Sequence, residues 1–393
     1  MMLHLDLMQK TSGIPLSRKL CYAIGGMPYQ MTGTARGFFM QIFLLDVVKM
    51  GAFSASIILF LGRAWDAISD PLIGYAVSKS GQTRTGKLIP WIVFSMPLGV
   101  LSYCYHVPYS SLNIRAYLTG ALVLGMLYFL CCLVLFLGVK EQLAPLSKLD
   151  RINVPYLTAI KMIVGHTPYV RLVFGFLFAS LAFQLAQGNF ALFCTHATKM
   201  GAYFQHLVLI LLTAATISIP VWQTVLVTIG KKNIIFIGLS FYFPALIVIS
   251  LVKSSLPAFI MMSMLAGMSL AAFFLLPWSM LPDVVDDFKV KNPSCQDLEP
   301  LFYSCYGFFS KLGGDMSVGV STLVLYFAGY KPGACKHNPE VIFSLWVLFA
   351  PVPICLLLIS LMIFCFYPIN EERQRKIQDA LREAGYVFVF VLA

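Results

Sequence analysis

Long apolar runs alternate with short polar segments along most of the chain. The runs lie at about residues 20–45, 53–77, 88–110, 116–138, 169–195, 203–229, 232–252, 256–280, 300–328 and 342–367. A helix needs about twenty consecutive, mostly apolar residues to cross the hydrocarbon core of a bilayer. The runs therefore predict an all-α, polytopic membrane protein with about ten transmembrane helices.

The polar segment at about 139–168 is the longest between two runs. It separates an amino-terminal helical bundle, 1–138, from a carboxy-terminal six-helix bundle, 169–367, which a cytoplasmic tail, 368–393, follows. Two bundles joined by a central cytoplasmic loop are typical of transporters whose site lies between the bundles. Five apolar residues of the loop could form one face of an interfacial helix: Tyr156, Leu157, Ile160, Ile163 and Val164. The alternative is that the loop is a plain linker. No short repeat is apparent.

The composition excludes a soluble globular protein, because 59% of the 393 residues are hydrophobic and only 11% are charged. The formal net charge is +11. If the amino terminus lies inside, most Lys and Arg residues fall in cytoplasmic segments, as the positive-inside rule requires. We therefore expect both termini in the cytoplasm and contacts with anionic membrane lipids, and we expect no nucleic-acid binding.

The sequence lacks the motifs that carry common enzymatic chemistry. No metalloprotease, nucleophile-elbow or phosphate-loop pattern is present, and no cysteine pair has metal-ligand spacing. We therefore predict neither an enzyme nor a cofactor. Residues 1–20 mix charges without a compact apolar core, so we expect no cleavable signal peptide.

Two aspartates, Asp66 and Asp70, lie inside the second apolar run, Gly62 to Pro71. On a helix their spacing places both carboxylates on one face, where they repel each other and are costly at membrane depth. A positive partner is needed, which is either Arg63, one turn earlier, or a cation taken from water. The first choice predicts a structural pair of Arg63 with Asp66, and the second predicts a site for a coupling ion, sodium or a proton.

Lys311 lies in the middle third of its apolar run, too deep for its ammonium group to reach an interface easily. It needs a carboxylate, a bound anion or a water-filled cavity. Asp315, one helical turn later, is the nearest partner in the sequence and predicts a local ion pair. The alternative is that Lys311 contacts an anionic group of a substrate.

Prolines beside polar or aromatic groups interrupt three runs, at Gly25 to Gln30, at Ile219 to Gln223 and at Leu275 to Asp283. Such breaks free backbone carbonyls that can line a permeation path. Gln30 is suited to hydrogen bonding with a substrate, and Trp278 to a cationic headgroup or to anchoring at the membrane interface. The acidic cluster Asp283, Asp286 and Asp287, beside Lys289 and Lys291, predicts a solvated cap or gate at a cytoplasmic edge.

Several segments resemble a known family. Arg63 to Pro71, followed by Arg84 to Trp91, resembles the glycoside-pentoside-hexuronide:cation symporter branch of the major facilitator superfamily. The segments Phe53 to Arg63, Leu275 to Phe288 and Tyr367 to Arg373 resemble, more closely, the sodium-dependent lysophosphatidylcholine symporters of that branch.

The resemblance implies a major facilitator fold and sodium-driven uptake of lysophospholipids that carry long-chain fatty acids such as docosahexaenoate. It assigns Asp66 and Asp70 to the sodium site and places Lys311 near the lipid phosphate. Phe274 and Trp278 match aromatic positions of the same pathway. A structural or gating role is left for three charged residues: Arg63, Asp283 and Asp315. A monomer in the cell membrane is expected.

The chain departs from the family pattern in the amino-terminal half. The family has twelve spans, but here Cys104 to Leu112 resembles the end of the fourth span and Arg115 to Gln142 resembles the sixth. About two helices of an incomplete amino-terminal bundle are therefore missing. Gln187 stands where we expect an acidic residue. The alternatives are a cation-coupled sugar or sphingolipid carrier of the same branch, and a non-transporting truncated variant retained in the endoplasmic reticulum.

Overall fold

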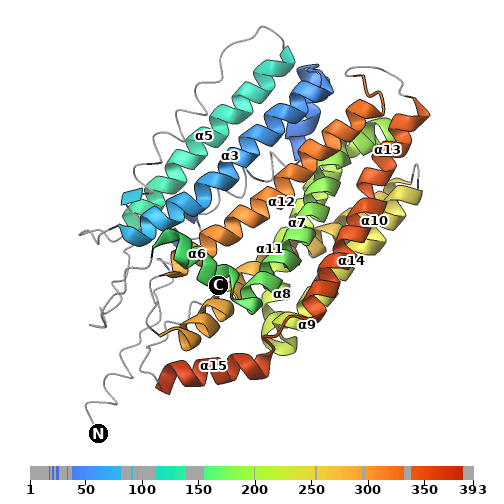
Figure 1. Ribbon diagram of the computed structural model, residues 1–393. Coiled ribbons are helices and arrows are strands. Elements are labelled where there is room, and N and C mark those ends of the chain that lie inside the picture. Colours follow the sequence, from blue (N-terminus) through green and yellow to red (C-terminus); the bar gives the residue numbers. More distant parts are fainter. Residues whose placement is uncertain are drawn as a thin grey trace. The chain divides into compact units, whose positions relative to one another are not determined.

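The computed structural model describes residues 38–80, 112–138, 155–198, 200–252, 255–293, 298–331 and 338–383, with a few single positions before residue 112. Every element in these segments is a helix (Figure 1). The predicted spans at 88–110 and most of 20–45 lie outside the described residues, as does Gln30. For the described part, the all-α prediction is confirmed.

Within the described residues, five helical stretches are long and apolar enough to cross a membrane: Thr167–Ala197, Gly201–Ile229, Lys231–Leu251, Leu256–Lys291 and Pro339–Cys365. They match five of the predicted runs to within a few residues, except that the fourth continues well past the predicted end. Two further helices, α3 and α12, have 28 and 29 residues and carry charged side chains at mid-length. The total of about ten spans stays a prediction.

The chain divides into two compact units, residues 1–36 with 79–148, and residues 37–78 with 149–393. The first unit contains α5 (Leu112–Gly138). The main helices of the second unit are η1 (Phe43–Val47), α3 (Ala52–Lys79), α6 (Tyr156–Val164), α7 (Thr167–Leu192), η2 (Phe193–Ala197), α8 (Phe204–Ile229), α9 (Lys231–Ser240), α10 (Tyr242–Leu251), α11 (Leu256–Lys291), α12 (Glu299–Phe327), α13 (Pro339–Phe349), α14 (Pro351–Cys365) and α15 (Glu371–Glu383). The candidate site lies within this second unit.

Helix α7 forms the centre of the second unit and packs against α11, α12 and α14. In its most apolar window 61% of the residues are buried, the largest share among the five spans. Phe183 stacks on Phe273 of α11 with ring centroids 4.6 Å apart, and Phe176 meets Phe364 of α14 at 4.9 Å. Gly175 permits that approach, since a Cβ there would collide with the Phe364 ring.

Two helix ends share a local structure that the sequence analysis missed. The turns η1 and η2 are both π-helical. In each, an amide bonds the carbonyl five residues earlier: Val48 N to Phe43 O at 2.9 Å and Thr198 N to Phe193 O at 3.0 Å. The same four residues follow each turn, Lys49 to Ala52 and Lys199 to Ala202, at a separation of 150 positions. A match of four residues is too short to be a sequence repeat, so the feature that the two helix ends share is their backbone geometry.

The helix predicted in the central loop is present as α6. Ala159 and Ile163 are fully buried, and Tyr156 packs its ring against Tyr75 of α3 at 4.8 Å. Leu157 and Val164, however, are 78% and 54% exposed. Successive helix residues turn by about 100°, which places these two on a neighbouring face. The single apolar face was therefore only partly right.

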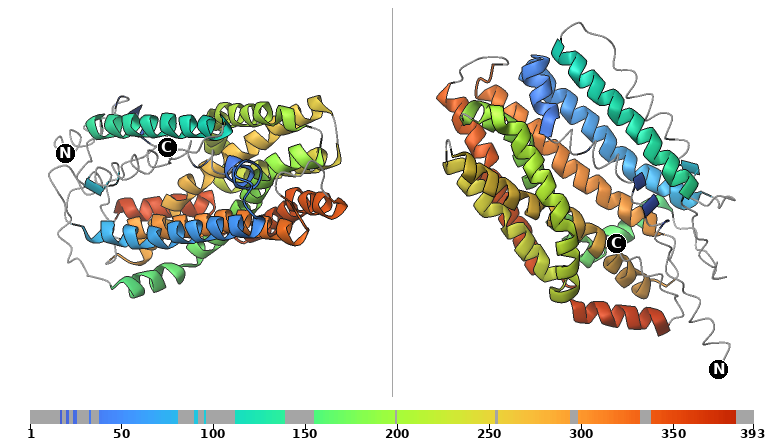
Figure 2. Two further views of the ribbon diagram at one scale, coloured as in Figure 1. Left: turned by 90° about the horizontal axis from the view of Figure 1, so that it is seen from above. Right: turned by 180° about the vertical axis from the view of Figure 1, so that it is seen from behind.

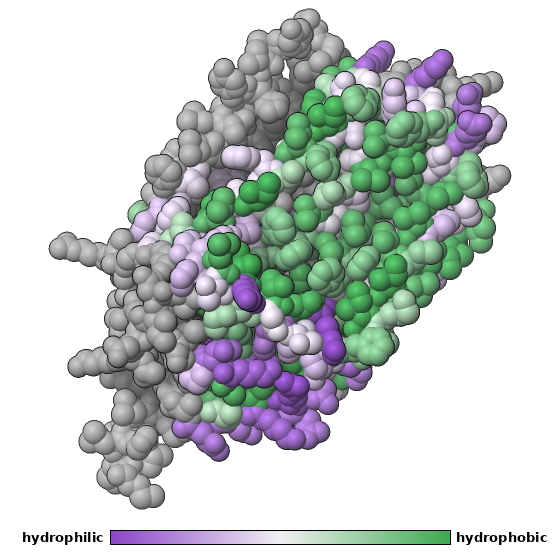
Figure 3. Space-filling view, viewed as in Figure 1, coloured by the Kyte–Doolittle hydropathy of each residue, from purple (hydrophilic) through white to green (hydrophobic). Residues whose placement is uncertain are grey.

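One face of the second unit is largely hydrophobic. In the space-filling view, apolar side chains cover the surface around α13 and α14, while hydrophilic side chains gather at the end that carries α15 (Figure 3). Phe343 of α13 and Leu358 and Met362 of α14 are half or more exposed. In water such a surface would be costly, but lipid chains solvate it.

Candidate functional site

An ion pair joins two helices that lie far apart in the sequence. Lys311 Nζ on α12 lies 2.9 Å from Asp70 Oδ1 and 2.8 Å from Oδ2 on α3. The two side chains are 25% and 23% exposed. Because both oxygens are close to the ammonium group, this is a charge-assisted contact at mid-length of two long helices.

The pair is held in place because α3 lies along α12 for much of its length (Figure 1, Figure 2). Toward one end, Ser56 Oγ donates a hydrogen bond to the carbonyl of Gly319 at 2.8 Å. Toward the other end, Gly74 lies against the side chain of Ser304, where a Cβ on residue 74 would collide. Small and hydroxyl-bearing residues thus let the two backbones approach closely.

Gly307 leaves room for the carboxylate of Asp70. A Cβ at residue 307 would lie 3.2 Å from Asp70 Oδ2, closer than ordinary van der Waals contact. A side chain here would therefore push the carboxylate away from its place beside Lys311.

We expect Gly307→Ala to lower the sodium-dependent uptake that the family resemblance implies, because the added methyl group displaces Asp70 Oδ2 by a few tenths of an ångström. A misplacement of about 1 Å in a reacting site can cost about 100-fold, so the loss here should be smaller than that. Gly319→Ala on the same helix is the matched control, since its Cβ would lie at 3.6 Å from Phe60, an ordinary contact. Equal uptake by the two variants would refute the positioning role.

The structure places Asp70 and Lys311 together, whereas the sequence assigned them to separate sites. The side chains of Arg63, Asp66 and Asp315 lie outside the described part of the structure. The predicted pairs of Arg63 with Asp66 and of Lys311 with Asp315 therefore stay predictions. The contact of Lys311 with Asp70 spans 241 residues and had no signal in local spacing.

The described residues near Asp70 suit a hard cation such as sodium. Pro71 lies inside α3 and has no N–H, so the carbonyl of Ala67 cannot accept its usual helical bond. Carboxylate, carbonyl and hydroxyl oxygens are the ligands that hard cations prefer, and Ser69 adds a hydroxyl one residue away. No cluster of three or more metal-ligand side chains of the His, Cys, Asp and Glu type occurs among the described residues.

Trp278, predicted as a substrate contact, lies in an aromatic cluster between α11 and α12. Its ring stacks on Tyr303 with centroids 6.2 Å apart and meets Tyr306 edge-on at 6.3 Å. Trp278 stays 50% exposed, and Phe274, one turn earlier, is 38% exposed. The sequence analysis missed both tyrosines, although they lie one turn apart and within eight residues of Lys311.

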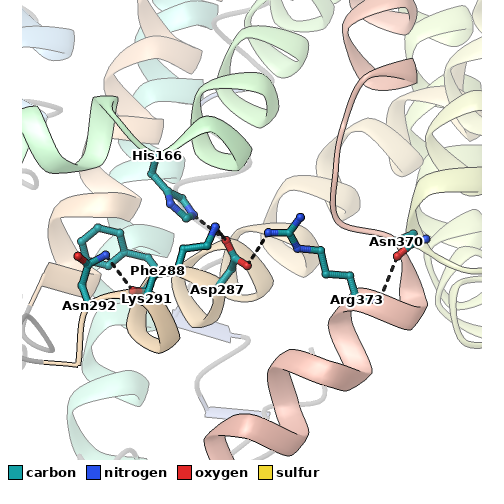
Figure 4. A network of polar contacts seen from close by, with 7 residues as sticks. All are labelled: His166, Asp287, Phe288, Lys291, Asn292, Asn370 and Arg373. Atoms are coloured by element: carbon teal, nitrogen blue, oxygen red, sulfur yellow. Dashed lines mark hydrogen bonds and ion pairs between the residues drawn. The ribbon is translucent and has the colours of Figure 1, made fainter.

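A buried polar network lies where the sequence predicted a solvated acidic cap (Figure 4). Asp287 is 3% exposed and Asp283 is 8% exposed, so a solvated cap is wrong for these two. The partners of Asp287 are His166 Nε2 at 3.3 Å, Lys291 Nζ at 2.6 Å and Arg373 Nη2 at 3.1 Å. The partners of Asp283 are Lys231 Nζ at 2.6 Å and the amide of Gln374 at 2.7 Å.

This α15 network, named for the helix that supplies Arg373 and Gln374, ties α15 to α11 and to the start of α7. Distant segments cover the two carboxylates, which is why local charge spacing did not reveal their burial. Tyr367, just after α14, is buried beside them, and burial together with the carboxylates raises the pKa of its hydroxyl well above the usual range. Tyr367 therefore stays neutral.

The end of α14 is fixed by cations from two other helices. Lys232 of α9 donates hydrogen bonds to the carbonyls of Cys365 at 3.1 Å and Tyr367 at 3.0 Å. Arg171 of α7 donates one to the carbonyl of Phe366. The last carbonyls of a helix lack partners within it and carry a partial negative charge, so these contacts stabilise the junction from α14 to α15.

Comparison with known proteins identifies the family. The family described as MFS/sugar transport protein matches residues 21–108 and 99–371. The chain belongs to this family. It therefore has the major facilitator fold and is a polytopic membrane protein. The two matched segments overlap at residues 99–108, close to the point at which the sequence analysis expects about two helices of the family to be missing.

Similar proteins are named as transporters. The sodium-dependent lysophosphatidylcholine symporter 1 of Mus musculus is 38% identical over 477 residues, covering 95% of this chain and 89% of the relative. Symporter 1-B of Danio rerio is 40% identical, with 95% and 90% covered. The sphingosine-1-phosphate transporter MFSD2B of Xenopus tropicalis is 34% identical, with 92% and 90% covered. An alignment of 477 positions exceeds the 393 residues of this chain, so it contains gaps opposite segments that the chain lacks.

Proposed function

We propose that the protein is a sodium-coupled symporter of lysophosphatidylcholine that carries long-chain fatty acids, working by alternating access. The observation that carries this proposal is the contact of Lys311 with Asp70, two intramembrane charges suited to a lipid phosphate and to sodium respectively. The names of the relatives at 37–40% identity support it. We infer a carrier, not an enzyme, that uses sodium as the coupling ion and needs no cofactor.

The headgroup chemistry matches the described side chains. A phosphate needs a cationic donor, which Lys311 provides. A trimethylammonium group is attracted to the faces of aromatic rings, and Trp278, Tyr303 and Tyr306 form a cluster of such rings. The exposed ring of Phe274 offers an apolar surface for the acyl chain. A zwitterionic lipid is therefore bound by separate groups for its two charges.

The ion pair suggests how the two solutes are coupled. In the structure Lys311 neutralises Asp70 at contact distance. A sodium ion at Asp70 takes over that role and frees the ammonium group for the lipid phosphate. Each solute then raises the affinity for the other, because binding free energies are coupled reciprocally.

We place the protein in the cell membrane as a monomer with both termini in the cytoplasm, so that the α15 network faces the cytoplasm. Retention in the endoplasmic reticulum stays the expectation for a non-transporting variant. A sphingosine-1-phosphate carrier is the second candidate, because an MFSD2B relative is 34% identical. That substrate has a phosphate for Lys311 but no trimethylammonium group for the aromatic cluster.

The test is uptake of labelled lysophosphatidylcholine and labelled sphingosine-1-phosphate, in sodium and in sodium-free buffer, by cells with confirmed surface expression. We expect sodium-dependent uptake of the first substrate and its loss in Lys311→Ala. Lys376→Ala is the control, since Lys376 is 74% exposed on α15. No uptake of either substrate by protein at the surface would refute the proposal, and uptake of sphingosine-1-phosphate alone would favour the second candidate.

We expect Trp278→Leu to lower uptake of lysophosphatidylcholine by about 2- to 30-fold, the range that follows from a cation–π contact of about 0.5–2 kcal/mol. Uptake of lysophosphatidic acid, which has no quaternary ammonium, should fall much less. Competition assays with the two lipids measure this ratio. Trp346→Leu on α13 is the matched control, since Trp346 also stacks on an aromatic ring. An equal loss for both lipids in Trp278→Leu would contradict the headgroup assignment.

A further inference from the structure

A small cavity lies inside the second unit, lined by α7, α8, α10, α11 and α13 and by Phe38. It leaves about 20 Å³ for the centre of a water molecule. Its walls are mostly apolar and aromatic, with Phe183, Phe190, Tyr242 and Phe349 among them. Two polar side chains, Gln187 of α7 and Ser263 of α11, also line it. None of the lining residues belongs to the ion pair of Asp70 with Lys311.

The hydroxyl of Ser263 at this cavity is unusual because no protein atom among the described residues satisfies it. Ser263 is 1% exposed, and its hydroxyl has no hydrogen-bond partner in the described part of the chain. The same holds for both amide atoms of Gln41, which is also 1% exposed. Gln41 packs against Gly188, next to Gln187, since its Oε1 lies 3.0 Å from where a Cβ on Gly188 would be.

Other buried polar groups on the same helices are bonded. Ser269, six residues after Ser263 on α11, donates a hydrogen bond to the carbonyl of Gly238 at 2.6 Å. Asn189 of α7 accepts a hydrogen bond from Ser321 at 2.7 Å and donates one to the carbonyl of Leu185 at 2.8 Å. The packing of α7 and α11 thus provides hydrogen-bond partners for these buried polar groups. The hydroxyl of Ser263, which lies at the cavity, lacks such a partner among the described residues.

We propose that the cavity is a binding site for ordered water, which bonds Ser263 and Gln187 and so bridges α11 to α7. The size fits, because a water needs roughly 10–15 Å³ of such space and polar partners around it. An alkyl chain would leave both polar groups unpaired in an apolar wall, which is unfavourable. This site is independent of the proposed transport function, since it concerns the packing of one bundle.

Thermal unfolding of the purified protein in detergent tests the proposal. The deciding quantity is whether Ser263→Ala lowers or raises the melting temperature. If water bonds Ser263, then Ser263→Ala removes a satisfied hydroxyl and lowers the melting temperature. If the cavity is dry, the same change removes an unpaired hydroxyl and raises it. Ser269→Ala is the matched control, since Ser269 is as deeply buried and bonded within the protein, and we expect it to lower the melting temperature.

A high-resolution experimental map of the unmutated protein is the second measurement, and it does not depend on the variants folding. We expect a compact solvent peak within hydrogen-bond distance of Ser263 Oγ and of the Gln187 amide. A raised melting temperature for Ser263→Ala, or no density at this place, would overturn the proposal. Elongated density along the aromatic wall would also overturn it, in favour of an apolar ligand.

Discussion

Lys311→Met is expected to abolish sodium-dependent uptake and to destabilise the protein, because it leaves the carboxylate of Asp70 without the ammonium group that lies 2.8 Å away. Removing one partner of a buried ion pair costs on the order of 3–5 kcal/mol. The side chains here are 25% and 23% exposed, so the loss of stability should be smaller than that. Uptake should fall by at least about tenfold, the effect of about 1.4 kcal/mol.

A double-mutant cycle separates stability from transport. Asp70→Asn alone leaves an unpaired lysine, whereas Asp70→Asn with Lys311→Met removes both charges. We expect the double variant to melt at a higher temperature than either single variant, since the unpaired charge is gone. Uptake should stay lost in the double variant, because the ammonium group for the phosphate and the Asp70 carboxylate for sodium are both gone.

Melting temperatures in detergent and uptake by protein at the cell surface are measured for all four proteins. Recovery of both stability and uptake in the double variant would show that the pair only holds α3 to α12. In that case Lys311 and Asp70 would be structural, and the site would have to be sought elsewhere along the pathway.

The apolar pattern predicted the spans of the second unit well because their length and hydropathy are local properties. The runs at 169–195 and 203–229 correspond to helical stretches at Thr167–Ala197 and Gly201–Ile229. The run at 256–280 underestimated α11, which continues to Lys291. Two carboxylates in its last three turns, Asp283 and Asp287, are buried by partners from α9, from α15 and from the start of α7. A hydropathy pattern does not register such partners.

The candidate residues were identified from their chemistry, but their partners were not. A lysine and an aspartate at membrane depth each demand a counter-charge, which any single sequence reveals. Which counter-charge is chosen depends on helix packing, and here α3 against α12 brings together residues 241 positions apart. From the sequence alone, the partner expected for Lys311 is Asp315, one helical turn away. A pair with a residue on another helix, such as Asp70, cannot be detected from sequence spacing.

The paired π-turns and the water cavity could not be predicted for a related reason. Phe43 to Val47 and Phe193 to Ala197 share little sequence beyond their first residue, and their common feature is a hydrogen-bond register. The cavity is the space left where side chains of α7, α8, α10, α11 and α13 do not pack against one another completely. Both are properties of backbone geometry and packing, which composition and period do not encode.

Asp287→Ala is expected to lower the free energy of unfolding by about 3 kcal/mol, the low end for breaking a buried ion pair. The carboxylate of Asp287 is 5% exposed and contacts His166, Lys291 and Arg373, of which Arg373 anchors α15. Arg373 and Lys291 are 39% and 46% exposed, so water compensates them in part once the carboxylate is gone. The main loss is therefore the attachment of α15.

Thermal unfolding in detergent and limited trypsin digestion of α15 measure the two consequences. We expect a lower melting temperature and faster cleavage after the basic residues of α15, which α11 otherwise protects. Glu372→Ala is the matched control on α15, because Glu372 is 73% exposed and pairs with Lys376 one turn away. Exposed pairs of this kind contribute about 0–1 kcal/mol. If Asp287→Ala behaves like Glu372→Ala in both assays, the α15 network is not what holds this helix, and the buried residues Ile377 and Leu381 must do so instead.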